Sequence, residues 1–486
     1  MYTVPLQDLL QMEVLEPHEM LKAKGILIEF DHTRGKAAFV SHQWVDSAHP
    51  DPDFRQFRVL QDALRHLLFS DVTHVPLDAT TEGAWVNLKR LSVTDFTSKP
   101  LSFWYDYFSC PQLESAVSGE QSNLAHAISS IPAYVAKCSF FLALCPVIDS
   151  PSMGKVFSAA TWSKRGWCRL ERICRELSEN GSWILIQSKT RLQLLGTPLA
   201  FPSGGSVGEG EFTVEGDRAK LLPVLRQLLM RKVRFFARAQ DLVGYRLLLN
   251  MYSVHLRGLS AEPQPELLAD FEPDSRCTSL LTHFLYENGF QSVRSVDMAG
   301  FSPLHYAAVG GNPELVRDLL KQRADIDRKT RQANAEMGLL QWMSSLDLSI
   351  FYHNNDVVQV LLSARARHTG GLMPAIVLAA IQQNVEGLRM LCEQTTHSPL
   401  TRNLWGFTAF ECACIYSNGD LATVAECVRQ DRLGDKKLGP LEFSRALVLS
   451  AGVAVGCTPA VVQYLLEPWR PIYATKSSSN FHVCGL

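Results

Sequence analysis

Side chains that can bind or transform a ligand gather at three points in the N-terminal half. Each point lies where a buried strand is expected to end or where the following helix begins. In open α/β sheets, ligands bind at the carboxyl ends of the strands and at the helix starts beside them. The sequence therefore predicts one polar site at a sheet edge. Its expected members are Ser41, His42, Trp44, Asp106, Trp167 and Glu171.

The same region offers two other kinds of chemistry. His42 and Cys110 are a candidate base and thiol nucleophile, but no neighbouring group supplies an orienting partner or an oxyanion hole. A metal site drawn from the following loop is an alternative, although its proline-broken HPDPD run suits solvated carboxylates. That set is His42, Asp46, His49, Asp51 and Asp53. No metal and no cofactor is predicted, because the P-loop, Rossmann and HExxH patterns do not occur.

The elements expected to position these residues alternate between short apolar runs and amphipathic stretches. The expected strands cover residues 37–44, 103–108, 140–145 and 182–187. The expected helices between them cover residues 57–69, 121–137 and 165–179. This βαβαβαβ order is typical of a doubly wound parallel sheet, here with at least four strands.

Four motifs follow one another between residues 36 and 188: FVSHQW, WYDYFSCPQ, AISSIPAYVAKCSFFLAL and WSKRGWCRLE. In this order they resemble the TIR domain of immune receptors and the related fungal heterokaryon-incompatibility domain. WCRLE is the most specific element, because many TIR domains carry a WCxxE at this helix. In the enzymatic members that glutamate catalyses NAD cleavage, so the resemblance assigns this role to Glu171. WYDYFSCPQ is closer to the incompatibility domain, which implies no nicotinamide chemistry.

The resemblance leaves two roles open for Glu171. A catalytic carboxylate would lie beside the ribose of NAD and stabilise an oxocarbenium-like state as nicotinamide leaves. A structural carboxylate would pair with Arg169, Arg172 or Arg175 of its own helix, or with a neighbouring strand. TIR domains usually carry a flexible loop after the second strand, whereas residues 109–118 here contain a proline.

Residues 297–330 read DMAGFSPLHYAAVGGNPELVRDLLKQRADIDRKT. Ser302 is suited to cap a first helix, and Pro303 fits its first turn. Ala307 keeps this helix thin, and Gly310 and Gly311 can adopt the positive φ that ends it. A turn, a TPLH-like start, a small-residue helix, a glycine turn and an LL-containing second helix follow in order. The segment therefore resembles an ankyrin repeat.

Weaker copies follow this unit. Aligned on Leu319-Leu320, they are spaced by 42, 30, 36 and 38 residues, which scatter around the ~33 of ankyrin units and indicate insertions. The aligned pairs are Leu361-Leu362, Leu391-Cys392, Cys427-Val428 and Leu465-Leu466. A generic α-solenoid is the alternative. Either array offers a long concave face for binding rather than a catalytic pocket.

Composition limits the partners and the compartment. Lys and Arg number 47 against 49 acidic residues, so no overall field favours nucleic acid or anionic membranes. The N-terminus lacks the pattern of a secretory signal, and no apolar run approaches the ~18 residues of a membrane span. Twelve cysteines without a CxxC pair suit a reducing cytosol, so a cytoplasmic location is expected. Cys412 and Cys414 are expected to lie inside a helix.

The expected organisation is an N-terminal extension, a TIR-like α/β domain, a Gly/Pro/Ser-rich loop, connecting helices, ankyrin-like repeats and a tail. These parts cover residues 1–35, 36–195, 196–218, 219–271, 272–470 and 471–486. The leading hypothesis is an intracellular signalling or assembly protein. Its repeats bind a partner protein, and its TIR-like domain is an effector or self-association module. The alternative is a TIR-type NAD glycohydrolase, with NAD as substrate, that the repeats regulate or target.

Overall fold

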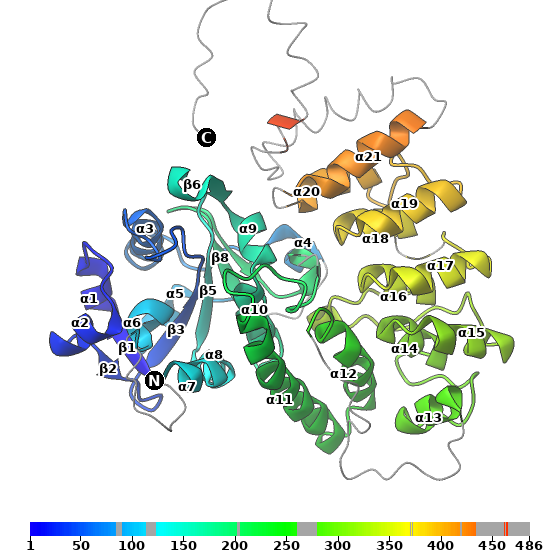
Figure 1. The fold of residues 1–486 in the computed structure, drawn as a ribbon, viewed down its shortest axis with the longest axis horizontal. Coiled ribbons are helices and arrows are strands. Elements are labelled where there is room, and N and C mark those ends of the chain that lie inside the picture. The colour runs from blue at the N-terminus through cyan, green and yellow to red at the C-terminus, as the bar shows by residue number, and fades with distance from the viewer. Residues whose placement is uncertain are drawn as a thin grey trace, which may run out of the picture.

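The protein consists of a mixed α/β unit and a stack of helix pairs, with two long helices between them (Figure 1). These helices are α11 (Asp217–Arg238) and α12 (Leu242–His255). The computed structural model describes residues 1–83, 90–112, 123–201, 205–259, 279–369, 371, 373–417, 420–433, 461, 463 and 464.

The α/β unit is built on a seven-stranded sheet with the order β2-β1-β4-β3-β5-β8-β9. Its strands are β1 (Tyr2–Pro5), β2 (Ile28–Glu29), β3 (Lys36–Ser41), β4 (Leu101–Tyr105), β5 (Phe140–Leu144), β8 (Trp183–Ile186) and β9 (Leu192–Leu195). Strands β4, β3, β5 and β8 are parallel neighbours, whereas β1, β2 and β9 pair antiparallel at the sides. The predicted α/β sheet is therefore confirmed as a mixed, mostly parallel sheet.

Helices cover both faces of this sheet, which explains why the central strands are apolar along their whole length. On one face, α3 (Arg55–Phe69) buries Phe57, Leu60 and Leu64. On the other lie α8 (Ile131–Lys137) and α10 (Gly166–Glu176). The shorter elements of this unit are α1 (Leu6–Gln11), α2 (His18–Ala23), α4 (Ala79–Gly83), α5 (Val93–Thr97), α6 (Asp106–Ser109), α7 (Asn123–Ser129), α9 (Ala159–Lys164), and the hairpin β6 (Ile148–Ser150) and β7 (Lys155–Phe157).

Several expected boundaries are wrong for local physical reasons. Residues 1–35, expected to be an extension, supply β1 and β2 to the sheet. The strand expected over 103–108 ends at Tyr105, because the chain turns into the short helix α6 at Asp106. The helix expected over 121–137 is divided into α7 and α8. Pro132 lies in the first turn of α8 and has no N–H to continue the earlier helix.

The C-terminal unit repeats one arrangement of two helices. Within the described residues the pairs are α14 (Pro303–Gly310) with α15 (Pro313–Lys321), α16 (Ser345–Phe351) with α17 (Asn355–Ser363), α18 (Ala375–Ile381) with α19 (Val385–Gln394), and α20 (Ala409–Tyr416) with α21 (Ala422–Leu433). Helix α13 (Leu280–Glu287) precedes them. The aligned apolar pairs fall on α15, α17, α19 and α21, whereas Leu465-Leu466 lies outside the described residues. One hydrophobic cluster runs through all of these pairs.

The Gly/Pro/Ser-rich loop at 196–218 packs into the molecule where it is described. It contains the 3-10 helix η2 (Pro198–Ala200), and Val207 further along the loop is buried. Gly208 crosses the backbone at Gly258 so closely that a Cβ at either position would overlap it. The crossing requires two glycines and fixes the loop against the end of α12.

Several contacts join the two units. Helix α11 packs on α10 and α12, and α12 packs on α14. A turn of the stack, η3 (Ala335–Met337), ends beside η2. Lys164 Nζ pairs with Asp420 Oδ2 at 2.7 Å, and Thr80 Oγ1 lies 2.9 Å from the Tyr416 hydroxyl. The first helices of the pairs therefore face the α/β unit, and the second helices face outward (Figure 1).

Candidate functional site

Five of the six predicted site residues meet at the carboxyl ends of β3 and β4. Ser41 ends β3, and His42 and Trp44 follow it. Asp106 begins α6 directly after β4, and Glu171 approaches from the middle of α10. The hydrogen bonds described below divide them into two groups. The Asp106 pair is His42 with Asp106, to which Trp44 is also bonded. The Glu171 chain is Ser41 with Glu171, extended by a further residue, Trp162.

The Asp106 pair is a hydrogen-bonded ion pair. His42 Nε2 lies 2.7 Å from Asp106 Oδ1, and the Trp44 indole N–H donates to Asp106 Oδ2 at 3.2 Å. On its other side the imidazole stacks on the Tyr105 ring, with centroids 3.8 Å apart, and His42 Nδ1 lies 3.0 Å from the Tyr105 hydroxyl. The His42 side chain is 2% exposed and that of Asp106 is 38% exposed. A ligand would therefore approach the pair from the Asp106 side.

Charge stabilises this pair against the cost of burial. Burial lowers the pKa of His42, but the charge and hydrogen bond of Asp106 more than offset it, so the pKa of His42 is raised. Burial raises the pKa of Asp106, yet His42 again outweighs it and the pKa of Asp106 is lowered. Both shifts favour the imidazolium–carboxylate form.

In the Glu171 chain the pKa of the carboxyl group is raised, whereas the pKa of Asp106 is lowered. The Trp162 indole N–H donates to Ser41 Oγ at 3.0 Å, and the Ser41 hydroxyl donates to Glu171 Oε2 at 2.5 Å. Burial raises the pKa of Glu171 to about 8, and the nearby Asp106 charge adds to the shift. Glu171 is therefore protonated at neutral pH and beside an ionised Asp106. Two carboxyl groups with separated pKa values are the arrangement that acid–base sites use.

Trp167 makes no hydrogen bond to these five residues in the part of the chain that the structure describes. Its indole N–H instead donates to Asp217 Oδ2 at 3.2 Å, at the start of α11. The arginines of α10 also turn away from Glu171: Arg169 Nε donates to the Ser163 carbonyl at 2.7 Å, and Arg172 Nε pairs with Glu176. Glu171 is thus hydrogen-bonded to Ser41 of strand β3 rather than paired with the arginines of its own helix.

Residues of the other two candidate sites, the thiol site and the metal site, have structural roles. Burial, followed by the charges of Asp106 and Glu171, raises the pKa of Cys110 to about 12, so its thiol stays protonated. The carboxylate of Asp51 accepts the Arg55 and Phe57 backbone N–H groups and holds the start of α3. Across the described residues, no three His, Cys, Asp or Glu side chains converge on a point that suits a metal ion.

A second group of candidate residues lies at the turns before the first helices of the stack, and the sequence analysis missed it. Gly300, Trp342 and Gly406 each lie two residues before a helix cap, with φ of 85°, 62° and 85°. Large apolar side chains are exposed at these turns. The turn-tip residues are Met298, Trp342, Leu404, Trp405 and Phe407. Aligning the sequence on the caps rather than on the apolar pairs would have revealed them.

The helix-pair architecture and these turns define a repeat protein of the α-solenoid class. Residues 299–331, which contain α14 and α15, match the family model of the ankyrin repeat. The C-terminal region therefore contains an ankyrin repeat, and the resemblance seen in the sequence is confirmed for this segment. No curated protein matches the chain. None of the described helices has the length and apolar character needed to cross a bilayer.

Proposed function

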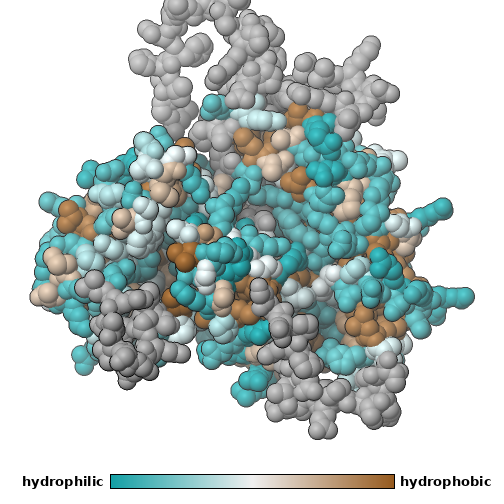
Figure 2. Space-filling view, viewed as in Figure 1, coloured by the Kyte–Doolittle hydropathy of each residue, from teal (hydrophilic) through white to brown (hydrophobic). Residues whose placement is uncertain are grey.

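We propose that this protein is a signalling or assembly protein whose repeat stack binds a partner protein through the turn-tip residues. In this proposal the α/β unit, with its TIR-like motifs, is the effector or self-association module. Ankyrin repeats suggest protein binding. The first helices of the stack face α12 and the α/β unit, whereas the turn-tip residues are exposed and so are the more accessible surface. Figure 2 shows hydrophobic side chains reaching a mostly hydrophilic surface beside the helices of the stack.

Trp342 carries this proposal. It adopts the left-handed conformation, φ 62°, at a turn position that Gly300 and Gly406 occupy in other repeats. A bulky residue in this conformation costs on the order of 1 kcal/mol or more. Burial does not offset the cost, because the Trp342 side chain is 48% exposed. A strained, exposed aromatic residue at a repeated turn is better explained by contact with a partner than by folding.

Trp342→Gly is expected to raise the free energy of unfolding by about 1 kcal/mol while weakening partner binding by roughly tenfold or more. Stability would be measured by chemical denaturation. Binding would be measured by affinity capture from cells, followed by titration of the purified partner. Phe69→Ser, which removes an exposed aromatic from the far α/β unit, is the matched control. A Trp342→Gly protein that is less stable, or that keeps the full affinity of the parent, contradicts the proposal.

The second candidate function is NAD cleavage at Glu171. Two observations favour it: the WCRLE motif, and a buried carboxyl of raised pKa beside the Asp106 pair. If the ionised carboxylate stabilises the transition state, turnover should rise with pH and level off above about 8, where Glu171 becomes ionised.

The full-length protein would be incubated with NAD between pH 6 and pH 9, and free nicotinamide would be measured with time. Protein concentration would be varied, because self-association could assemble the site. Release of nicotinamide that falls as pH rises through this range contradicts a carboxylate role for Glu171. Absence of release at every pH and concentration favours the binding protein.

A further inference from the structure

Helix α11 has an exposed face that carries three arginines and one phenylalanine. Arg231, Arg234, Phe235 and Arg238 are exposed, and 52% of the surface of Phe235 is accessible. At 3.6 residues per turn, these four side chains lie within an arc of roughly 100° around the helix axis. The buried apolar residues of the helix lie on the opposite side, where it packs on α10 and α12. The packing of the molecule therefore leaves this face unused.

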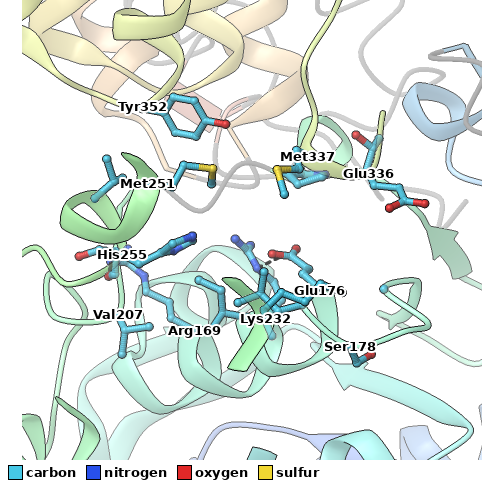
Figure 3. Close-up of a pocket in the computed structure, with 18 of the residues that line it drawn as sticks. Arg169, Glu176, Ser178, Val207, Lys232, Met251, His255, Glu336, Met337 and Tyr352 are labelled. Carbon is cyan, nitrogen blue, oxygen red and sulfur yellow. Dashed lines mark hydrogen bonds and ion pairs between the residues drawn. The ribbon is translucent and has the colours of Figure 1, made fainter. Parts of the chain in front are cut away.

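The three arginines of this face differ from other cations of α11, which lie beside carboxylates. Lys220, in the first turn, pairs with Asp217 at 2.7 Å. Lys232 lines a cavity of about 450 Å³ between the two units, together with the carboxylates of Glu176 and Glu336 (Figure 3). The three arginines, in contrast, make no ion pair and no side-chain hydrogen bond to any described residue. Like charges three or four positions apart on a helix repel each other, so an anion outside the protein would be stabilising here.

The helix dipole explains only part of this arrangement. Cations are stabilised in the last turn of a helix, which accounts for Arg238. The effect falls off beyond that turn, so it does not account for Arg231, which lies two turns before the end. It does not account for the exposed Phe235 either. Leu242, at the start of α12, is a second large apolar side chain exposed at this end of the two helices, with 53% of its surface accessible.

This face lies at a projecting part of the molecule. Figure 1 shows the connected ends of α11 and α12 at the lower edge, between the two units. A flat surface can reach such a tip without a complementary groove. An anionic bilayer has a surface of this kind: its phosphates attract arginines, and the boundary between headgroups and acyl chains accepts aromatic and aliphatic side chains. Double-stranded nucleic acid also presents phosphates, but it has no apolar layer beneath them.

We propose that this face of α11 and the start of α12 bind the surface of an anionic lipid bilayer. The three arginines contact lipid phosphates, and Phe235 and Leu242 enter the boundary between headgroups and acyl chains. The formal net charge of the chain is -2, so the attraction comes from this local surface rather than from the molecule as a whole. The turn-tip residues belong to the stack, so the inference depends neither on the proposed partner protein nor on NAD cleavage.

The test is sedimentation of the full-length protein with vesicles of phosphatidylcholine, either alone or with about one-third phosphatidylserine. Binding to the phosphatidylserine vesicles is expected to be roughly tenfold tighter than binding to phosphatidylcholine alone, and to weaken as salt is added. Equal binding to both kinds of vesicle, or no binding to either at physiological salt, overturns the proposal. Vesicles that do not bind, while an RNA duplex does, identify a nucleic-acid surface instead.

Two variants and a matched control locate the binding. The double variant Arg231→Gln/Arg234→Gln is expected to bind phosphatidylserine vesicles about twentyfold more weakly, because each arginine near an anionic surface contributes about fivefold. Phe235→Ser is expected to bind about fivefold more weakly, with the salt dependence of the parent. The control, Arg323→Gln/Arg365→Gln, removes the same charge from two exposed arginines of the stack and should bind like the parent. Equal loss in both double variants contradicts the assignment, because binding would then follow net charge alone. Full binding by Arg231→Gln/Arg234→Gln contradicts it as well.

Discussion

Ala307→Arg is expected to unfold the helix stack. Ala307 lies in α14, is 1% exposed and belongs to the hydrophobic cluster that runs through the helix pairs. Helix α14 packs against α12, α15 and α16, so a long side chain has no direction in which to leave. Overpacking costs about 1–3 kcal/mol, and an unpaired buried charge costs several more. The sum, roughly 5 kcal/mol, is comparable to the whole stability of many domains.

The measurement is a thermal melt of the full-length protein by circular dichroism, together with limited proteolysis to locate the unfolded segment. New cleavage is expected between residues 300 and 430, because the repeats support one another through shared faces. Gln359→Arg is the matched control, since it adds the same side chain on the exposed face of α17. A melt of Ala307→Arg that coincides with this control would contradict the tight packing of the repeats.

The parts of the fold that the sequence predicted are those whose pattern is set locally. Strands β3, β5 and β8 are buried on both faces, so each is a continuous apolar run that needs no partner to be recognised. The side strands β1 and β9 are short and mixed in character, and their place depends on pairing with distant segments. Nothing in their own residues distinguishes them from loops.

Within the stack, too, local sequence patterns reveal some repeats, whereas others depend on their packing context. The first unit was recognised because Ser302, Pro303 and Gly311 have fixed backbone roles. Later units replace the turn glycine by His353 and Gln383, which adopt the same positive φ of 56° and 58°. Their packing context, rather than their intrinsic preference, imposes this conformation. The copy that starts at Asn403 keeps its turn glycine, Gly406, whereas the other copies were recognised in the sequence only by the spacing of their apolar residues.

The meeting of His42, Asp106 and Glu171 was predictable because parallel strands end at one edge. The orientation of Trp167 was not, since its partner Asp217 is fifty residues away on α11. The cavity was still less predictable. Its lining joins α10 to Tyr352 and Gln382 of the stack, and these residues meet only after the α11–α12 hairpin brings the units together.

Glu171→Gln is expected to stabilise the protein, and to do so increasingly as pH rises. Burial raises the pKa of Glu171 from 4.5 to about 8. Between these values the folded protein holds a proton that the unfolded chain has released. Stability is therefore lost as pH rises from about 4.5 to 8 and is constant above that. Glutamine resembles the protonated carboxyl, and its side-chain oxygen still accepts the Ser41 hydroxyl.

The expected gain is absent near pH 4, is on the order of 3 kcal/mol at pH 7 and approaches roughly 5 kcal/mol at pH 9. It would be measured by chemical denaturation of parent and variant at pH 5, 7 and 9. Other titrating groups are common to both proteins, so their effects cancel in the difference. Glu13→Gln, on the exposed surface, is the control and should show no pH-dependent gain. A constant difference between parent and Glu171→Gln at all three pH values would mean that Glu171 is not held protonated.

Stability and turnover together decide what Glu171 does. If the role of Glu171 is only structural, the Glu171→Gln variant is more stable and keeps every activity of the parent. A catalytic carboxylate gives the opposite result: Glu171→Gln should be more stable and yet release nicotinamide from NAD roughly a thousandfold more slowly than the parent. Burying a carboxyl that must ionise to act is a cost to folding that only function explains. A variant that is both more stable and fully active removes Glu171 from any catalytic role, even if the protein proves to cleave NAD.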